Sequence, residues 1–432
     1  MLIEKQGLLK KYQKIEQIRR MVLNRIWIGM FLVAIVMGFS KLIFWQDTAI
    51  LQKMMDGLFE ASKNGFELSI FMTGALCLWM GFMKIGEEGG AIKIMSKLVA
   101  PLFTRLFPEI PKDHPAVGSI MMNFSANMLG LDNAATPFGL KAMKDLQELN
   151  PNKTVASNAQ IMFLVLNASG LTIIPVSILA ARAANNSNSI SSVFLPILIT
   201  TFFATLGGLI YVSIRQKINL LNKVVLLYLG TLTSAVFGLI FILNAYPDKI
   251  DVISSVVSNT IIFGIILFFF GLAVRAKVNL FESFIEGAKG GFEVALNIVP
   301  YLIAMLAAIS LFRSSGAFID GMTLIKNGFL FAGLTAVEFV DALPVIFMKP
   351  FSGSGARGLM IEIYQNPAFG PDSFVGKLAS TFQGSTETTF YVLAVYFGSV
   401  KVTNTRYAAL AGIICDVIGG IVAIFVSYLF FA

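Results

Sequence analysis

Four stretches of the chain are longer than 20 residues and contain no Asp, Glu, Lys or Arg: 154–181, 190–214, 224–247 and 252–274. A helix needs roughly 20 apolar residues to cross the hydrocarbon core of a bilayer. Charged residues make up 13% of the chain, whereas soluble domains carry about 25%. We therefore expect an all-α polytopic membrane protein whose first partner is the lipid bilayer. Barrel strands are excluded because they would alternate over about 10 residues.

Hydropathy predicts nine spanning segments, at 26–45, 64–85, 154–181, 190–214, 224–247, 252–274, 292–312, 373–400 and 407–431. Two further segments, 115–149 and 328–360, are predicted to be re-entrant. The basic segment 1–21 has the spacing of an amphipathic surface helix, and its charge keeps the N-terminus cytoplasmic. We expect a multi-pass protein of the inner membrane. The net charge of +8 then sets topology, so no nucleic-acid partner is expected.

An internal repeat organises the chain. Lys63-Asn-Gly-Phe-Glu67 reappears as Lys289-Gly-Gly-Phe-Glu293, 226 residues later. The similarity extends outward, and Asn167-Ala-Ser169 falls on Gln383-Gly-Ser385. The predicted organisation is a basic segment at 1–21, a first repeat at 22–214, a connecting transmembrane helix at 215–249 and a second repeat at 250–432. Five crossings separate equivalent points, so the repeats have opposite orientations, as in many secondary transporters.

Polar residues interrupt the apolar sequence at three places, which predicts broken helices and a substrate site. Broken helices leave backbone N–H and C=O groups that need partners from protein, water or a ligand. The candidate substrate-binding residues are Asn127, Asp132, Asn133, Thr136, Asn167, Ser169, Ser352, Ser354, Gln383, Ser385, Thr386, Glu387 and Thr388.

Each interruption has a structural alternative. Residues 123–137 form either the tip of a re-entrant hairpin or a surface loop that caps a helix. Residues 350–358 offer successive N–H groups to an anion, with Arg357 beside them, or form a flexible turn. Residues 381–389 either line a cavity, which Glu387 requires in mid-membrane, or bond helices together. Asp416, mid-way along the last span, would pair with a basic group or relay protons.

The sequence does not predict an enzyme. His114 is the only histidine, and Cys77 and Cys415 lie inside apolar runs. Neither a zinc site nor an activated nucleophile follows from these residues. We expect no cofactor and no bound metal. Coupling to Na⁺ or H⁺ would use unwound carbonyls or Glu387.

Two sets of motifs resemble the spore maturation proteins A and B, joined in one chain. Residues 127–143 carry the A-like motif, NMLGLDNAATPFGLKAM. The B-like motifs are at 313–317, 351–355 and 379–398. The resemblance implies two gate-like repeats with the nucleoside-recognition domain. That domain is also recognised in concentrative nucleoside transporters and in ferrous iron transport membrane proteins.

These observations lead to three hypotheses. The first is a secondary transporter or permease for a small polar solute, either nucleoside-like or a carboxylate. The second is a non-transporting scaffold or spore-maturation-type assembly factor. The third is a metal-ion transporter, which only scattered Met residues and two Cys support. A homo-oligomer is compatible with each hypothesis.

Overall fold

The computed structural model describes residues 27–111, 113–129, 132–246, 249–333 and 336–431. The predicted basic helix at 1–21 lies outside these residues. The described part is helical, with one isolated bridge between Val155 and Asn404, which confirms the all-α class. Among the described residues, six helices are long and apolar enough to span a membrane: Trp27–Phe44, Ile50–Glu88, Ile190–Gln216, Lys223–Ile242, Val252–Arg275 and Ala408–Phe431. The helix pair Leu302–Ser314 and Ala317–Phe331, bent by 73°, forms either a broken seventh span or a re-entrant loop.

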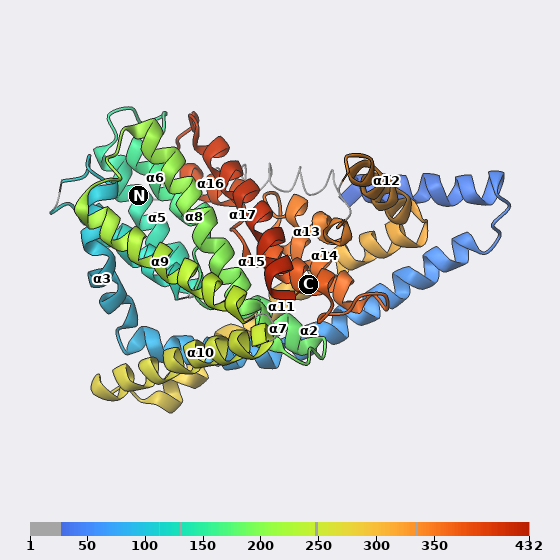
Figure 1. The fold of residues 1–432 in the computed structure, drawn as a ribbon, viewed down its shortest axis with the longest axis horizontal. Coiled ribbons are helices and arrows are strands. Elements are labelled where there is room, and N and C mark those ends of the chain that lie inside the picture. The colour runs from blue at the N-terminus through green and yellow to red at the C-terminus, as the bar shows by residue number, and fades with distance from the viewer. Residues whose placement is uncertain (1–26, 112, 130–131, 247–248, 334–335, 432) are drawn as a thin grey trace, which may run out of the picture.

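The two longest helices, α2 (Ile50–Glu88) and α11 (Leu280–Ser314), pack along each other (Figure 1). Gly65 lies against Ile303, and Gly291 lies against Cys77, so the helices are antiparallel. The offset of 226 residues in the repeat relates Gly65 to Gly291 and also Cys77 to Ile303. The two contacts therefore exchange under the repeat, which is the arrangement expected of two oppositely oriented copies.

The predicted spans 64–85 and 292–312 cover only part of these helices and leave out mainly their N-terminal residues, 50–63 and 280–291. At 1.5 Å per residue, the 39 residues of α2 extend roughly 58 Å, about twice the thickness of a hydrocarbon core. Charged residues occupy the ends of α2, while 68–83 contains none. The sequence prediction found the apolar centre of each helix and missed its polar extensions.

Each repeat continues with a helix and then a helical hairpin. The helices α3 (Ala91–Leu106) and α12 (Ala317–Phe331) follow Gly90 and Gly316, whose φ angles are 90° and 84°. The first hairpin pairs α4 (Pro115–Met128) with α5 (Asp132–Leu149). The second joins η3 (Glu338–Ala342) and α13 (Leu343–Met348) to α14 (Gly353–Gln365). Both hairpins fall in the segments predicted to be re-entrant.

Two of the predicted spans are each broken into two short helices, which agrees with the predicted broken helices. Segment 154–181 contains α6 (Asn158–Ala168) and begins α7 (Val176–Ala184). Segment 373–400 contains α15 (Phe374–Gly384) and α16 (Thr389–Ser399). The first break follows from Gly170, with φ of 63°, and from Pro175, which has no N–H to continue a helix. Ser157 and Ser373 cap α6 and α15 in the same way.

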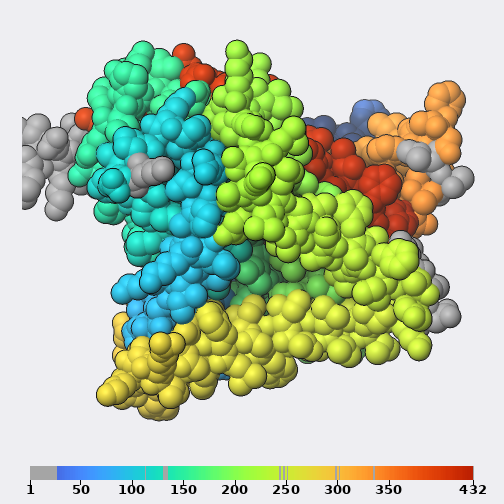
Figure 2. All heavy atoms as spheres, turned by 60° about the vertical axis from the view of Figure 1, so that its left-hand side comes forward, coloured from blue at the N-terminus to red at the C-terminus, as the bar shows by residue number. Residues whose placement is uncertain are grey.

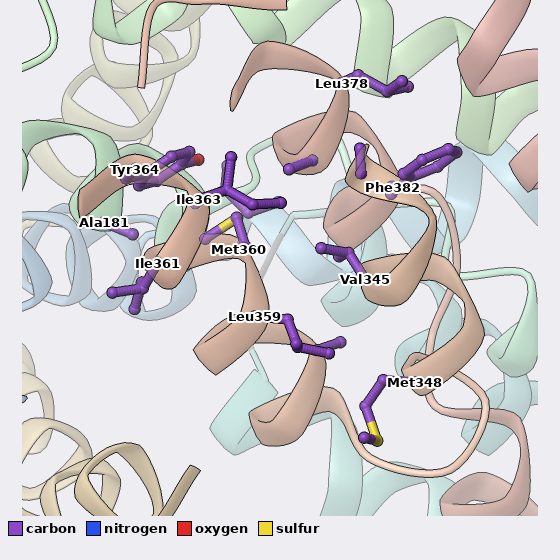
Figure 3. Packing of buried hydrophobic residues seen from close by; sticks show 14 of the residues in the cluster. Ala181, Val345, Met348, Leu359, Met360, Ile361, Ile363, Tyr364, Leu378 and Phe382 are labelled. Carbon is purple, nitrogen blue, oxygen red and sulfur yellow. The ribbon is translucent and has the colours of Figure 1, made fainter. Parts of the chain in front are cut away.

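The remaining helices surround these broken elements (Figures 1 and 2). They are η1 (Ile190–Val193), α8 (Phe194–Gln216), α9 (Lys223–Ala245), α10 (Ile250–Arg275) and α17 (Ala408–Phe431). α8 packs on α17, where Gly208 meets Cys415. Figure 3 shows a core where Val345, Met360 and Phe382 of α13, α14 and α15 are buried. This packing fixes the hairpin of the second repeat against its broken helix.

Candidate functional site

The two broken spans cross at their breaks. The backbone N–H of Glu387 donates a 2.9 Å hydrogen bond to the carbonyl oxygen of Ala168. Gly170 packs so closely that a Cβ there would lie 2.8 Å from the nitrogen of Glu387. Only glycine combines this close approach with a positive φ at low cost. One break therefore satisfies part of the unpaired backbone of the other.

Contacts between the repeats also join both ends of the crossing. At one end lies Arg182, which follows the first break. Its guanidinium donates hydrogen bonds to Asp372 Oδ1 at 2.7 Å and to the carbonyl oxygen of Pro371 at 2.6 Å. At the other end the N–H groups of Thr403 and Asn404 donate to the carbonyl oxygen of Thr154, at 2.9 and 3.0 Å. The first broken span runs from the Thr154 contact toward Arg182, and the second runs the opposite way. The broken spans are therefore antiparallel, with a contact between repeats near each end.

A cavity of about 340 Å³ lies beside the crossing, between the two breaks and the start of α14. Its wall from the first repeat contains Ile174, Pro175, Val176 and Ile178, together with Gly170 and the hydroxyl side chains of Thr172 and Ser177. Its polar wall comes from the second repeat and contains Lys349, Ser354, Arg357, Gln383, Thr386, Glu387, Thr388 and Tyr391. The space has the size of a small-molecule site, which is typically about 300–1,000 Å³.

Backbone and amide groups hold the polar wall in place. Ser352 caps α14, because its hydroxyl oxygen accepts from the N–H of Gly355 at 3.0 Å. Gln383 Nε2 donates to the carbonyl oxygen of Gly353 at 3.1 Å and so ties α15 to this turn. Gln383 is 4% exposed. Its Oε1 is buried and has no hydrogen-bond partner in the described parts of the chain.

Charged groups of both signs occur at the site. Lys349, at the end of α13, is 5% exposed. Glu387 lines the cavity and is exposed. Behind the wall, Asp416 of α17 is buried and accepts from the hydroxyls of Thr386 and Thr389, each at 2.7 Å. This carboxylate therefore fixes the second break from the side opposite the ligand space.

The arrangement can bind and orient a polar solute. Among the described residues, no three His, Cys, Asp or Glu side chains lie close enough together to share a metal ion. The donors and acceptors on the polar wall suit hydrogen bonding and charge pairing with a solute. The hydroxyls of Thr386 and Thr388 flank the carboxylate of Glu387 in sequence.

The cavity brings together five of the predicted site residues: Ser354, Gln383, Thr386, Glu387 and Thr388. Ser352 and Ser385 lie behind it, where Ser352 caps α14 and Ser385 bonds the carbonyl oxygen of Phe382. Thr136 is exposed on α5 and does not line the cavity. The side chains of Asp132 and Asn133 lie outside the described part of the structure.

The predicted amides of the first repeat form a separate network. Asn127 Nδ2 donates to Asn167 Oδ1 at 2.9 Å, and the hydroxyl of Tyr396 donates to the same oxygen at 3.2 Å. Asn167 Nδ2 donates to the carbonyl oxygen of Phe163 at 2.9 Å. Ser169 bonds the carbonyl oxygen of Leu166 and accepts from Thr205. These residues bond the helices together, which was the structural alternative for such side chains.

Sequence reasoning did not propose Lys349, Arg357 or Tyr391 as binding residues, although they line the cavity. Arg357 was noted beside the glycine-rich turn but was not proposed. Lys349 directly follows the apolar run 342–348 and precedes Pro350 at the break. A lysine between an apolar run and a helix break is the signal that identifies it, because a buried cation needs a functional or structural reason.

The chain matches one family model and is similar to two known proteins. Residues 69–185 match the family model Gate, described as nucleoside recognition. Spore maturation protein A of Bacillus subtilis (strain 168) is 35% identical over 199 residues, which are 98% of that protein and 45% of this chain. Spore maturation protein B of the same organism is 43% identical over 171 residues, which are 90% of that protein and 40% of this chain. No solved structure matches the chain. The chain therefore belongs to the spore maturation protein A and B family.

Proposed function

We propose that the protein is a secondary transporter that carries a small polar solute across the inner membrane through the cavity at the crossed breaks. The observation that carries this proposal is the position of the cavity. It lies where two antiparallel broken spans meet and takes one wall from each repeat. Transporters built from inverted repeats place their substrates at such discontinuous helices.

The contacts near the two ends of the crossing suit alternating access. Opening the cavity toward the Arg182 end requires separation of Arg182 from Asp372 and Pro371. Opening toward the other end requires loss of the bonds from Thr403 and Asn404 to Thr154. A rocking motion of one repeat against the other would break one of these two sets of hydrogen bonds while keeping the other. Glu387 and Asp416 are the carboxylates placed to couple this motion to H⁺ or Na⁺.

Flux into liposomes tests the proposal. Purified full-length protein is reconstituted, and uptake of a panel of nucleosides and small carboxylates is measured with imposed H⁺ or Na⁺ gradients. Glu387→Gln is expected to lower flux at least tenfold without loss of folded protein. The matched control is Glu148→Gln, which changes an exposed carboxylate on α5 and is expected to keep full flux. Equal flux in the two variants would argue against this site.

A second function is supported by the names of the relatives, which record spore maturation. In that case the protein is an assembly factor, and its polar breaks bind another protein or only pack. An assembly factor shows no solute flux in liposomes and tolerates Glu387→Gln.

The cytoplasmic N-terminus belongs to the proposal as well. Protease protection of an N-terminal tag in right-side-out vesicles checks it, and cleavage of the tag from outside would contradict it.

A further inference from the structure

We infer that the protein binds the headgroup of an anionic phospholipid where α8 ends and α17 begins. This site shares no lining residue with the cavity, so lipid would bind there whether or not the protein transports a solute. Three features of the molecule point to it: two arginines that meet on one tyrosine ring, further cations in the neighbouring turns, and a position at the ends of spanning helices.

Two guanidinium groups share the ring of Tyr407. The Cζ atom of Arg215 lies 5.0 Å from the ring centroid, and the Cζ atom of Arg406 lies 5.3 Å from it. Both distances are within the range of a cation–π interaction. Gln216 Nε2 donates to the hydroxyl of Tyr407 at 2.9 Å, which holds the ring against the end of α8. The ring therefore keeps two like charges near each other, and we call Arg215 and Arg406 the arginine pair.

The arginine pair is exposed, and in the described part of the chain neither member forms an ion pair. Arg406 Nη1 donates to two neutral acceptors, the carbonyl oxygen of Ala156 at 3.1 Å and Asn158 Oδ1 at 2.9 Å. The amide of Asn158 also donates to Glu109 at 2.7 Å, so an amide and not this carboxylate contacts Arg406. Two like charges held on one ring repel each other, and a bound anion relieves that repulsion.

Further cations lie in the neighbouring turns. Lys217 is the C-cap of α8, and Lys401 follows the end of α16. Lys217, Lys401 and Arg406 have φ angles of 57°, 62° and 51°, in the left-handed region that residues other than glycine seldom adopt. The dipoles of α8 and α16 favour the two lysines, whereas Arg406 precedes the positive N-terminal end of α17. An anion at this point offsets both the like charges and the dipole.

The position of the arginine pair favours a lipid headgroup over a free anion. α8 and α17 are long and apolar enough to span a membrane, and Arg215 lies in the last turn of α8. The rings of Tyr211 and Tyr407 meet edge to face, 6.3 Å apart, and tyrosines gather at the border between membrane and water. Arginine binds phosphate oxygens in a bidentate way, and basic pockets between spanning helices bind anionic headgroups. A zwitterionic headgroup carries its own cation and gains less from the pair.

Short-chain lipids test the site with the full-length protein in non-ionic detergent. Isothermal titration measures the binding of dioctanoyl phosphatidylglycerol, which is anionic, dioctanoyl phosphatidylcholine, which is zwitterionic, and inorganic phosphate. The proteins are the wild type, Arg215→Gln, Arg215→Gln combined with Arg406→Gln, and the control Lys249→Gln. Lys249 is an exposed cation 6.0 Å from the ring of Tyr246, beyond the other end of α9. The thermal unfolding midpoint without lipid is measured for each protein.

We expect phosphatidylglycerol to bind the wild type about tenfold more tightly than phosphatidylcholine, and more tightly than inorganic phosphate. Arg215→Gln should lower the affinity for phosphatidylglycerol about fivefold, because each basic residue near a headgroup contributes a similar share. The double variant should bind the two lipids nearly equally, and Lys249→Gln should bind both like the wild type. About 0.5 M NaCl should weaken the binding of phosphatidylglycerol, since both arginines are exposed.

Equal affinity of the wild type for the two lipids would overturn the inference. Unchanged binding of phosphatidylglycerol by Arg215→Gln would overturn it as well. This single variant leaves the hydrogen bonds of Arg406 to Ala156 and Asn158 in place, so it decides the question even if the double variant has a lower midpoint. Inorganic phosphate that binds as tightly as phosphatidylglycerol would identify a free-anion site and contradict the assignment to a lipid.

Discussion

Arg182 provides the most direct test of how the two repeats are held together. Its side chain is fully buried at the end of α7. The guanidinium donates to carbonyl oxygens, serine hydroxyls and one carboxylate, and the partners are Ser187, Ser189, Ile190, Ser192, Pro371, Ser380 and Asp372. Three of these partners belong to the second repeat. Arg182→Gln keeps a polar side chain but removes the charge and most of the donors.

The expected cost follows from the exposure of the partners. Breaking a buried ion pair by removing one member costs about 3–5 kcal/mol. The side chain of Asp372 is 28% exposed, so water recovers part of its loss, and the lower end of that range applies. A chain of this length has an unfolding entropy of about 0.9 kcal/mol per kelvin, and the midpoint is therefore expected to fall by about 3 °C. Arg182→Lys keeps the charge without the planar fork and should lose about half as much.

The assay is thermal unfolding in mild detergent, followed by intrinsic fluorescence at a fixed scan rate. Arg275→Gln is the matched control, because Arg275 is exposed at the end of α10. An exposed substitution of this kind changes stability by about 0.5 kcal/mol or less. A double-mutant cycle with Asp372→Asn isolates the pair, and its coupling should exceed about 1 kcal/mol. Equal midpoints for Arg182→Gln and Arg275→Gln would refute the assignment of Arg182 as the link between the repeats.

Three further predictions concern Asp372, Gly170, and the two amides of Asn167 and Gln383. Partial burial opposes ionisation of Asp372, yet hydrogen bonds from Ser187 and the Asn188 N–H, with the charge of Arg182, hold the pKa of this carboxyl below its usual value. The resulting stabilisation is present above about pH 4 and is lost as pH falls through the lowered pKa. The drop in the thermal unfolding midpoint on acidification should therefore be smaller in Asp372→Asn than in the wild type. Gly170→Ala should cost about 1–3 kcal/mol of stability and reduce flux, because φ is positive and the new Cβ would meet the backbone of the second break at Thr386 and Glu387. The control Gly230→Ala, in open space on α9, should be neutral in both assays. Asn167→Leu should destabilise the protein by about 1–3 kcal/mol, because Asn127 and Tyr396 lose their hydrogen-bond acceptor. Gln383→Met should lower flux with a smaller change in the unfolding midpoint. The reverse pattern would contradict the division between a structural amide and a binding amide.

Long apolar runs and the repeat made much of the fold predictable. The charge-free stretches at 190–214, 224–247 and 252–274 became helices, because composition and length alone decide that outcome in a membrane. The antiparallel packing of α2 on α11 agrees with the parity argument from the repeat. The break at 385–388 lies within the predicted interruption 381–389, whereas the exact bounds of both breaks were harder to place. Apolar residues flank each break, and hydropathy averaged over a window does not register a few residues with unpaired backbone.

The binding residues were only partly predictable, because the sequence does not show which face of a helix a polar residue occupies. Ser352 and Ser354 are two residues apart, yet one caps α14 behind the cavity and the other lines it. Lys349 was not among the predicted residues. Its burial depends on how α13 and α14 fold over α15, which is a long-range packing result.

The repeat also explains why only five of the thirteen predicted polar residues line the cavity. Asn167 and Gln383 are equivalent in sequence, and each is the last residue but one of a short capped helix. Asn167 accepts from Asn127 and Tyr396 and is satisfied within the protein. Gln383 is one methylene longer and bonds the backbone of α14, and its Oε1 is buried without a hydrogen-bond partner among the described residues. The duplicated breaks thus differ: the charged side chains that line the cavity all come from the second repeat, whereas the first repeat contributes apolar residues with Thr172 and Ser177. A symmetric site would present the same groups to a solute from both directions, whereas a solute in this cavity would meet charged side chains on one side only.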